Sequence, residues 1–94
     1  MAIRSFRDKE TRKVFARERS KAVPVELQRK GLKKLNQIHY ASDLKDLRVP
    51  PGNRLEKLSG DRAGQHSIRI NDQYRVCFVW DEGDAYDVEV VDYH

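Results

Sequence analysis

The sequence contains few of the residues that would indicate a disulfide, a thiolate metal site or a membrane span. Its 94 residues include one cysteine, Cys77, so no disulfide can form within the chain and no cysteine pair is available for a metal. No apolar run approaches the roughly 18 residues that cross a bilayer, and the N-terminus lacks the apolar stretch of a signal peptide. We therefore expect a soluble, cytoplasmic protein without membrane contact.

The motifs of common metal and cofactor sites are also missing. No histidine, cysteine or carboxylate cluster has metal-ligand spacing, and no serine, histidine and aspartate form a defensible catalytic set. The glycine-containing turn at residues 60–64 matches neither the phosphate-binding loop of NTPases nor the dinucleotide fingerprint. No repeat, linker or low-complexity segment is present. We expect residues 1–94 to form one small domain that uses no metal and no cofactor.

Charge is distributed unevenly along the chain. Residues 1–40 hold 12 Lys and Arg against 4 Asp and Glu, whereas residues 41–94 hold 7 against 11, so the halves carry +8 and −4. A basic half indicates a polyanion or an acidic protein as partner. The alternative is that these cations only solvate helix faces, as most surface lysines and arginines do.

The N-terminal half is expected to form two helices and a short helical turn. Asp8 can cap a helix over residues 9–19, and Pro24 suits the start of a second helix over residues 25–40. A helical turn over residues 43–47 follows. The second helix is amphipathic. We expect Val25, Leu27, Leu32, Leu35 and Ile38 on its inner face, and Arg29, Lys30, Lys33 and Lys34 on its outer face.

The last third of the chain is expected to form four strands, because apolar and polar residues alternate between turn signals. They cover residues 54–58, 65–70, 74–80 and 85–93, and residues 3–6 are a candidate edge strand. The alternation directs Ile68, Ile70, Tyr74, Val76, Phe78, Trp80, Tyr86, Val88 and Val90 toward the helices. We therefore expect an α+β fold: a mainly antiparallel sheet with both helices on one face and an open, basic second face.

Two arginines are the first functional signal. The alternation places Arg69 and Arg75 together on the second face of the sheet, beside Ser67. Like charges on neighbouring strands repel unless something neutralises them, and arginine holds phosphate through two parallel N–H bonds. The alternative is that each pairs with a local carboxylate such as Asp92 or Glu89.

The C-terminal tripeptide is the second signal. Asp92, Tyr93 and His94 carry three polar side chains that do not extend the apolar pattern of the last strand. Histidine exchanges protons near neutral pH, although His39, late in the second helix, is better explained as structural. From the pattern alone, an ordinary frayed chain end accounts best for the tripeptide.

Residues 50–94 resemble a known family. The run P-P-G-N-R-L-E-K-L-S-G-D-R-A-G-Q-H-S-I-R-I-N-D-Q-Y-R-V-C-F, closing with V-V-D-Y-H, is similar to the HigB/GraT branch of the RelE/ParE toxin superfamily. The G-D-R-x-G turn, the S-I-R strand, the N-D-Q-Y-R hairpin and the terminal D-Y-H are specific in combination, whereas each alone is weak.

The resemblance implies a small toxin of a type II toxin–antitoxin system with a RelE-like fold. It implies a cognate HigA-like antitoxin with a helix-turn-helix domain, so that operator DNA is contacted only through the antitoxin. It also implies an endoribonuclease that enters the ribosomal A site and cleaves mRNA without a metal. The 2′-hydroxyl is the nucleophile, and the products are a 2′,3′-cyclic phosphate and a 5′-hydroxyl.

Matched residue by residue, the family's active groups fall on Arg75, Asp92, Tyr93 and His94. Glu56 stands where some relatives carry a histidine, so it is either a substitute base or a missing group. In this hypothesis Arg75 neutralises the phosphate, His94 carries a proton, Asp92 orients it and Tyr93 positions a nucleotide. The remaining phosphate contacts are expected from Lys57, Arg62, His66 and Arg69. The rival readings are a ParE-like toxin that blocks DNA gyrase and a non-catalytic nucleic-acid-binding module.

Overall fold

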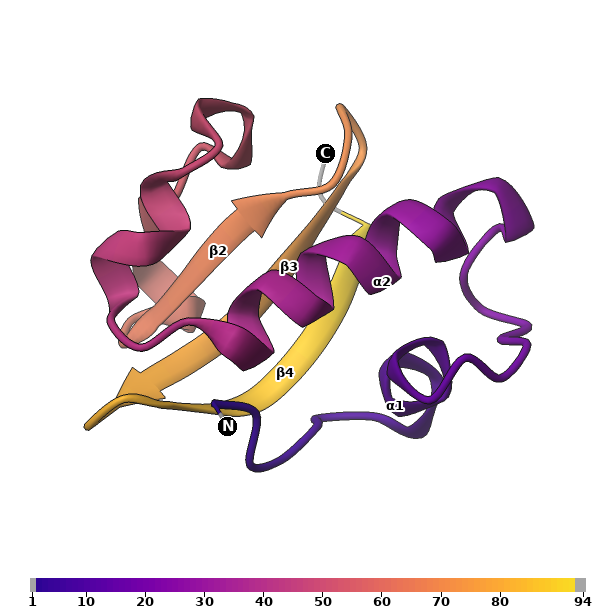
Figure 1. The fold of residues 1–94 in the computed structure, drawn as a ribbon, viewed down its shortest axis with the longest axis horizontal. Coiled ribbons are helices and arrows are strands. Elements are labelled where there is room, and N and C mark those ends of the chain that lie inside the picture. Colours follow the sequence, from indigo (N-terminus) through magenta and orange to yellow (C-terminus); the bar gives the residue numbers. More distant parts are fainter. Residues whose placement is uncertain (1, 93–94) are drawn as a thin grey trace.

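A computed structural model describes residues 2–92 and shows one antiparallel sheet with two helices on one face (Figure 1). The strands lie in chain order, and α2 crosses β3 and β4. This arrangement confirms the expected α+β fold. The elements are α1 (Lys9–Phe15), α2 (Val25–Tyr40), β1 (Glu56–Lys57), β2 (Gln65–Arg69), β3 (Tyr74–Asp81) and β4 (Asp84–Asp92), with 3₁₀ turns η1 (Leu44–Arg48), η2 (Pro51–Asn53) and η3 (Gly60–Arg62).

The helix starts agree with the sequence signals. The Asp8 carboxylate accepts a hydrogen bond from the Thr11 N–H at 2.7 Å, and α2 has the predicted bounds, directly after Pro24. α1 ends at Phe15, four residues earlier than expected, because Arg17 adopts a left-handed φ of 64°. No helix within residues 2–92 combines the length and apolar character that a membrane span requires.

Two expectations for α2 are wrong. Val25, at its first position, is 62 % exposed, and Lys34 is only 7 % exposed. Lys34 lies seven residues after Leu27 and four before Ile38, so helical spacing places it on the buried stripe despite its charge. The core otherwise holds expected residues: Leu27, Leu35, Ile38, Ile68, Ile70, Val76, Phe78 and Val88 are buried. Val14 of α1 and Leu47 of η1 are buried with them.

The buried Lys34 belongs to a polar network that joins α2 to the loop before β1. Its ammonium donates to the Asn53 Oδ1 atom at 2.6 Å. Asn53, itself fully buried, donates through Nδ2 to Gln37 Oε1 at 2.9 Å and to the Leu47 carbonyl at 3.2 Å. Burial lowers the pKa of Lys34, and the neighbouring cations lower it further. The network therefore fixes the loop that leads into β1.

Replacing Asn53 with alanine is expected to destabilise the protein by about 3 kcal/mol, because a buried ammonium loses its acceptor. Thermal unfolding should then occur at least 10 °C lower, at roughly 4–8 °C for each kcal/mol in a domain of this size. Asn36→Ala, on the outer side of α2, is the matched control and should change stability by less than about 0.5 kcal/mol. Equal melting temperatures for the two variants would contradict the role of the network.

The sheet contains one irregularity, in β4. Cys77 pairs with Glu89 and Val79 with Tyr86, so β4 has an extra residue between these pairs, and Asp87 has a left-handed φ of 53°. Consequently Ala85 and Val88, three residues apart, are both fully buried in the core. Tyr86, expected on the core side, instead pairs with Val79 on the second face, and that expectation is wrong.

The expected edge strand at residues 3–6 is reduced to two isolated parallel bridges, Ile3 with Ala85 and Phe6 with Val88. Between them the Asp87 N–H donates to the Ser5 hydroxyl at 2.9 Å instead of to a backbone carbonyl. The irregularity of β4 therefore interrupts the ladder that a regular strand would need.

His39 ties this N-terminal segment to α2. Its Nδ1 atom accepts a hydrogen bond from the Ile3 N–H at 3.3 Å, and its ring makes edge contacts with Phe15 and Tyr40. Burial lowers the pKa of His39, so the folded protein favours the neutral imidazole.

Stability should therefore fall as the pH drops below about 6.5, where unfolded histidine takes up a proton that folded His39 resists. His39→Asn keeps an acceptor near the position of Nδ1 without titrating. Chemical unfolding between pH 8 and 5 should show a steeper loss of stability for the wild type than for this variant. Parallel pH curves would exclude His39 as the source.

Candidate active site

The second face of the sheet brings the two predicted arginines together. Arg69 pairs with Arg75 and Ser67 pairs with Cys77, and directly paired residues point to the same face. No helix of residues 2–92 covers this face, yet it is not bare: Arg75 is only 8 % exposed, and Ser67 and Cys77 are buried. Burial raises the pKa of the Cys77 thiol, which is a packed side chain rather than a nucleophile.

Arg75 is fixed by two of its three nitrogens. Nε donates to the Ser67 hydroxyl at 2.7 Å, and Nη2 donates to the Arg54 carbonyl at 2.6 Å. Nη1 makes a long ion pair, 3.9 Å to Glu56 Oε1. The guanidinium is thus held rigidly while Nη1 keeps N–H groups for another acceptor.

These residues line a cavity of about 280 Å³, which we call the arginine cavity; its lining residues are Arg54, Glu56, Arg69, Asn71, Asp72 and Arg75. Three guanidinium groups and two carboxylates leave it with a formal charge of +1. Arg69 forms an ion pair with Asp72, and Arg75 faces Glu56 at longer range. Arginine N–H groups can bind a phosphate, and a carboxylate beside them can accept a proton from a neighbouring hydroxyl.

Two turns shape this cavity. Arg54 follows η2 and has a left-handed φ of 45°, next to the buried Asn53. In the β2–β3 hairpin the Asn71 side chain accepts hydrogen bonds from the Gln73 and Tyr74 N–H groups at 2.9 and 2.7 Å. The conformation of these two turns, and not strand pairing, therefore positions Arg54, Asn71 and Asp72, which are half of the lining residues.

Asp92 ends β4 beside the same hairpin. It pairs with Tyr74, and its Oδ2 atom accepts a hydrogen bond from Gln73 Nε2 at 3.2 Å. Because Asp92 pairs with Tyr74 and not with Arg75, its Cα–Cβ bond points to the face opposite Arg75, at the end of the sheet. Tyr93 and His94, expected to complete the site, lie outside the described residues.

Lys57 and His66 do not lie with Arg75. They pair with each other, and His66 also pairs with Phe78, whose ring stacks on it at 6.3 Å between centroids. Both therefore lie on the face toward the helices, in a second cavity of about 440 Å³. We call it the helix-side cavity; it is lined by Asp43, Leu44, Lys45, Arg48, Leu55, Lys57 and His66.

Arg62 shares the face of Arg75 but does not line the arginine cavity. Its Nη1 atom donates to Gln65 Oε1 at 3.1 Å and to Glu89 Oε1 at 3.2 Å. Gln65 is four residues from Arg69, which corresponds to roughly 13 Å along the strand. Arg62 therefore holds η3 against the sheet, away from the arginine cavity.

Sequence reasoning missed Arg54, Asn71 and Asp72 as lining residues. The Asn71-Asp72 pair had been identified only as a hairpin signal, and Arg54 only as the start of a strand. For Asn71 and Asp72, the available indication was their position between Arg69 and Arg75 in the chain, whereas Arg54 is distant from both arginines in the sequence. No cluster of three or more metal-binding side chains occurs within residues 2–92.

Comparison with known proteins agrees with this architecture. Residues 4–94 match the family model described as the RelE-like toxin of the type II toxin–antitoxin system HigB. Toxin HigB-1 of Vibrio cholerae serotype O1 is 38 % identical over 81 residues, covering 85 % of each chain. Endoribonuclease HigB of Proteus vulgaris is 30 % identical over 92 residues, covering 98 % of this chain and 99 % of the relative.

Among solved structures, the YoeB–YefM complex from Staphylococcus aureus matches with a TM-score of 0.58 at 21 % identity, covering 100 % of this chain and 97 % of that one. This likeness supports the fold assignment. With a family model that spans nearly the whole sequence and a relative 38 % identical, the chain belongs to the HigB-like family of RelE-like toxins of type II toxin–antitoxin systems.

Proposed function

We propose that this toxin is an endoribonuclease that cleaves mRNA in the ribosomal A site by attack of the 2′-hydroxyl, without a metal. The rigidly held Arg75, with Nη1 facing a cavity shared with Glu56 and Arg69, is the observation that carries the proposal. The relative named Endoribonuclease HigB, matched along 98 % of this chain, supports the reaction class.

Arg75 is assigned to the phosphate undergoing attack. Charge on its non-bridging oxygens increases in the pentavalent transition state, and fixed donors stabilise that charge without having to reorganise. Arg69 and Arg54 add positive charge at the same cavity. Because Ser67 and the Arg54 carbonyl hold the guanidinium before substrate arrives, no binding energy is spent on ordering it.

Proton transfer requires a base for the 2′-hydroxyl and an acid for the 5′-oxygen. Glu56 is the candidate base: it projects onto the same face as Arg75 and is accessible, with 52 % of its side chain exposed. His94 is assigned as the acid on the strength of the D-Y-H motif, with Asp92 orienting it and Tyr93 positioning the nucleotide. Lys57 and His66 are left for contacts beyond the scissile phosphate.

The basic outer side of α2 is assigned to ribosomal RNA. Arg29, Lys30 and Lys33 are exposed there, and Arg17 and Arg19 add charge beyond α1. Ribosome binding should weaken steeply with salt, since each neutralised phosphate releases counterions. Sedimentation at 50 and 200 mM salt measures this dependence, and equal binding at both would reject the assignment.

We place this activity in the cytoplasm, under control of an antitoxin. Membership of a toxin–antitoxin family implies such a partner. We propose a HigA-like antitoxin with a helix-turn-helix domain. In this proposal the toxin contacts operator DNA only through the antitoxin.

The decisive experiment adds purified toxin to programmed ribosomes and maps mRNA ends by primer extension. EDTA is present, together with enough magnesium to keep the ribosomes intact. Discrete cuts within the A-site codon, with a cyclic phosphate at the upstream end, are expected. Intact mRNA together with inhibited DNA supercoiling would replace the proposal with the gyrase reading. Intact mRNA with neither effect would favour a binding module.

A further inference from the structure

The helix-side cavity is a second concentration of unused positive charge. Lys45 and Arg48 come from η1, and Lys57 comes from β1. None of the three forms an ion pair with another described residue, in contrast to Arg62 and Arg69, which do. The cavity's one carboxylate, Asp43, is occupied in capping η1, where it accepts from the Lys45 N–H.

One residue that lines this cavity, His66, carries a ring nitrogen that the fold leaves unused. The Nδ1 atom of His66 is buried and has no hydrogen-bond partner within residues 2–92. Its ring is supported from behind by Phe78, and Leu44 and Leu55 form apolar parts of the wall. A buried nitrogen without a partner is costly for the folded state, so His66 is held in place by its packing and not by a hydrogen bond of Nδ1.

The two cavities meet at the edge of the sheet. β1 is the edge strand and has two residues: Glu56 lines the arginine cavity and Lys57 lines the helix-side cavity. A single strand of RNA that runs over this edge of the sheet can therefore contact both cavities in turn.

We propose that the helix-side cavity binds one nucleotide of single-stranded RNA. Its phosphate contacts Lys45, Arg48 and Lys57, while its base lies against Leu44, Leu55 and the His66 ring. The volume of about 440 Å³ falls in the range of ligand pockets, and mixed apolar and cationic walls match a nucleotide better than a bare anion. The choice of RNA as ligand rests on the proposed function.

The chemistry of His66 supports this assignment. Burial lowers the pKa of His66, and Lys57 lowers it further. A phosphate placed among Lys45, Arg48 and Lys57 adds negative charge beside the ring, while Asp43 keeps its position at the cap. Nucleotide binding is therefore expected to raise the pKa of His66 relative to the free protein.

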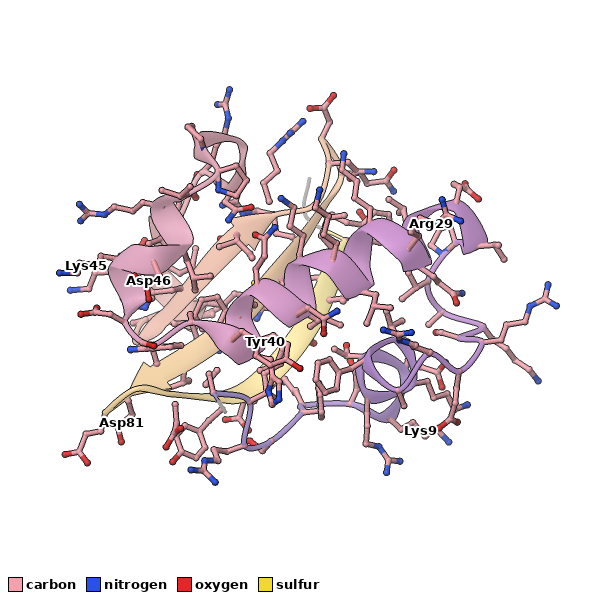
Figure 2. The ribbon with its side chains drawn as sticks, viewed as in Figure 1. Lys9, Arg29, Tyr40, Lys45, Asp46 and Asp81 are labelled. Atoms are coloured by element: carbon pink, nitrogen blue, oxygen red, sulfur yellow. The ribbon has the colours of Figure 1, made fainter. Side chains whose placement is uncertain are left out.

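The test uses the whole toxin without ribosomes, with adenosine 5′-monophosphate as the probe. Isotope-detected NMR titration should shift the signals of Leu44, Leu55 and the His66 ring. The double variant Lys45→Glu/Arg48→Glu should weaken this binding at least tenfold. The matched control is Lys9→Glu/Arg12→Glu, with the same charge change in α1, on the far side of the molecule from Lys45 (Figure 2); its affinity should stay within twofold of wild type.

Unshifted Leu44, Leu55 and His66 signals, or equal affinity in both double variants, would overturn the inference. Arg75→Lys should not alter this titration, so the result is independent of whether the toxin cleaves mRNA. A toxin that binds the nucleotide but cuts nothing would refute only the proposed function.

A crosslinking arm identifies the source of the RNA. A photoreactive residue at position 45, on programmed ribosomes, should label either the message or ribosomal RNA, and both agree with a nucleotide site. Labelling confined to ribosomal protein would contradict it.

Discussion

Arg75→Lys is expected to reduce ribosome-dependent mRNA cleavage by about 10²–10³-fold, the usual effect of losing one fixed donor to a transition-state oxyanion. Lysine keeps the charge but has one nitrogen. Its three N–H groups share that nitrogen, so they cannot reproduce the separate contacts that Arg75 makes through Nε to the Ser67 hydroxyl, through Nη2 to the Arg54 carbonyl and through Nη1 to a phosphate. The loss should appear in kcat, because the donors act on charge that forms during reaction.

Arg62→Lys is the matched control on the same face. Arg62 contacts Gln65 and Glu89 and does not line the arginine cavity, so its replacement should change cleavage by less than threefold. Single-turnover cleavage on programmed ribosomes gives the rate, and thermal unfolding of each variant shows whether the fold persists. Equal losses in the two variants would mean that general positive charge, not the fixed geometry of Arg75, supports catalysis.

The sequence was sufficient to place Arg69 opposite Arg75. Alternation over β2 and β3 assigns their face, and the tight Asn71-Asp72 turn leaves little freedom in the register. The same alternation puts His66, two residues before Ile68, on the core side, so the separation of His66 from Arg75 follows from the pattern. A phosphate contact from His66 therefore lies on the opposite face from Arg75.

Other features depend on geometry that residue type does not encode. The left-handed Asp87 shifts the alternation of β4, which moves Tyr86 to the second face and Ala85 into the core. Lys34 can be buried because the side chain of Asn53, 19 residues later in the chain, accepts a hydrogen bond from its ammonium. Long-range hydrogen bonds of this kind override the usual preference of lysine for the surface.

The arginine cavity contains residues placed by strand pairing and residues placed by loop geometry. Arg69 and Arg75 follow from strand pairing, but Arg54 reaches the cavity because η2 ends in a left-handed residue beside the buried Asn53. The Arg54 carbonyl then holds Arg75. A loop fixed in the core thereby contributes to the orientation of the predicted catalytic group, and Asn53→Ala should impair both stability and cleavage.

Replacing His94 with alanine is expected to lower the cleavage rate by about 10²–10⁴-fold, the usual contribution of one acid–base group. The expectation rests on the acid role proposed above for His94 in the terminal D-Y-H. The more informative measurement is the pH–rate profile, because an acid and a base affect opposite limbs. Loss of the acid removes the decline at high pH, whereas loss of the base removes the decline at low pH.

Glu56→Gln is the partner variant and separates the two roles. If Glu56 is the base and His94 the acid, each substitution removes a different limb, and the double variant loses far less than the product of the single effects. If His94 performs both transfers, Glu56→Gln changes the rate by less than threefold and leaves the profile intact. A His94→Ala toxin that retains the wild-type rate across the pH range would exclude His94 and direct attention to Asp92 and Tyr93.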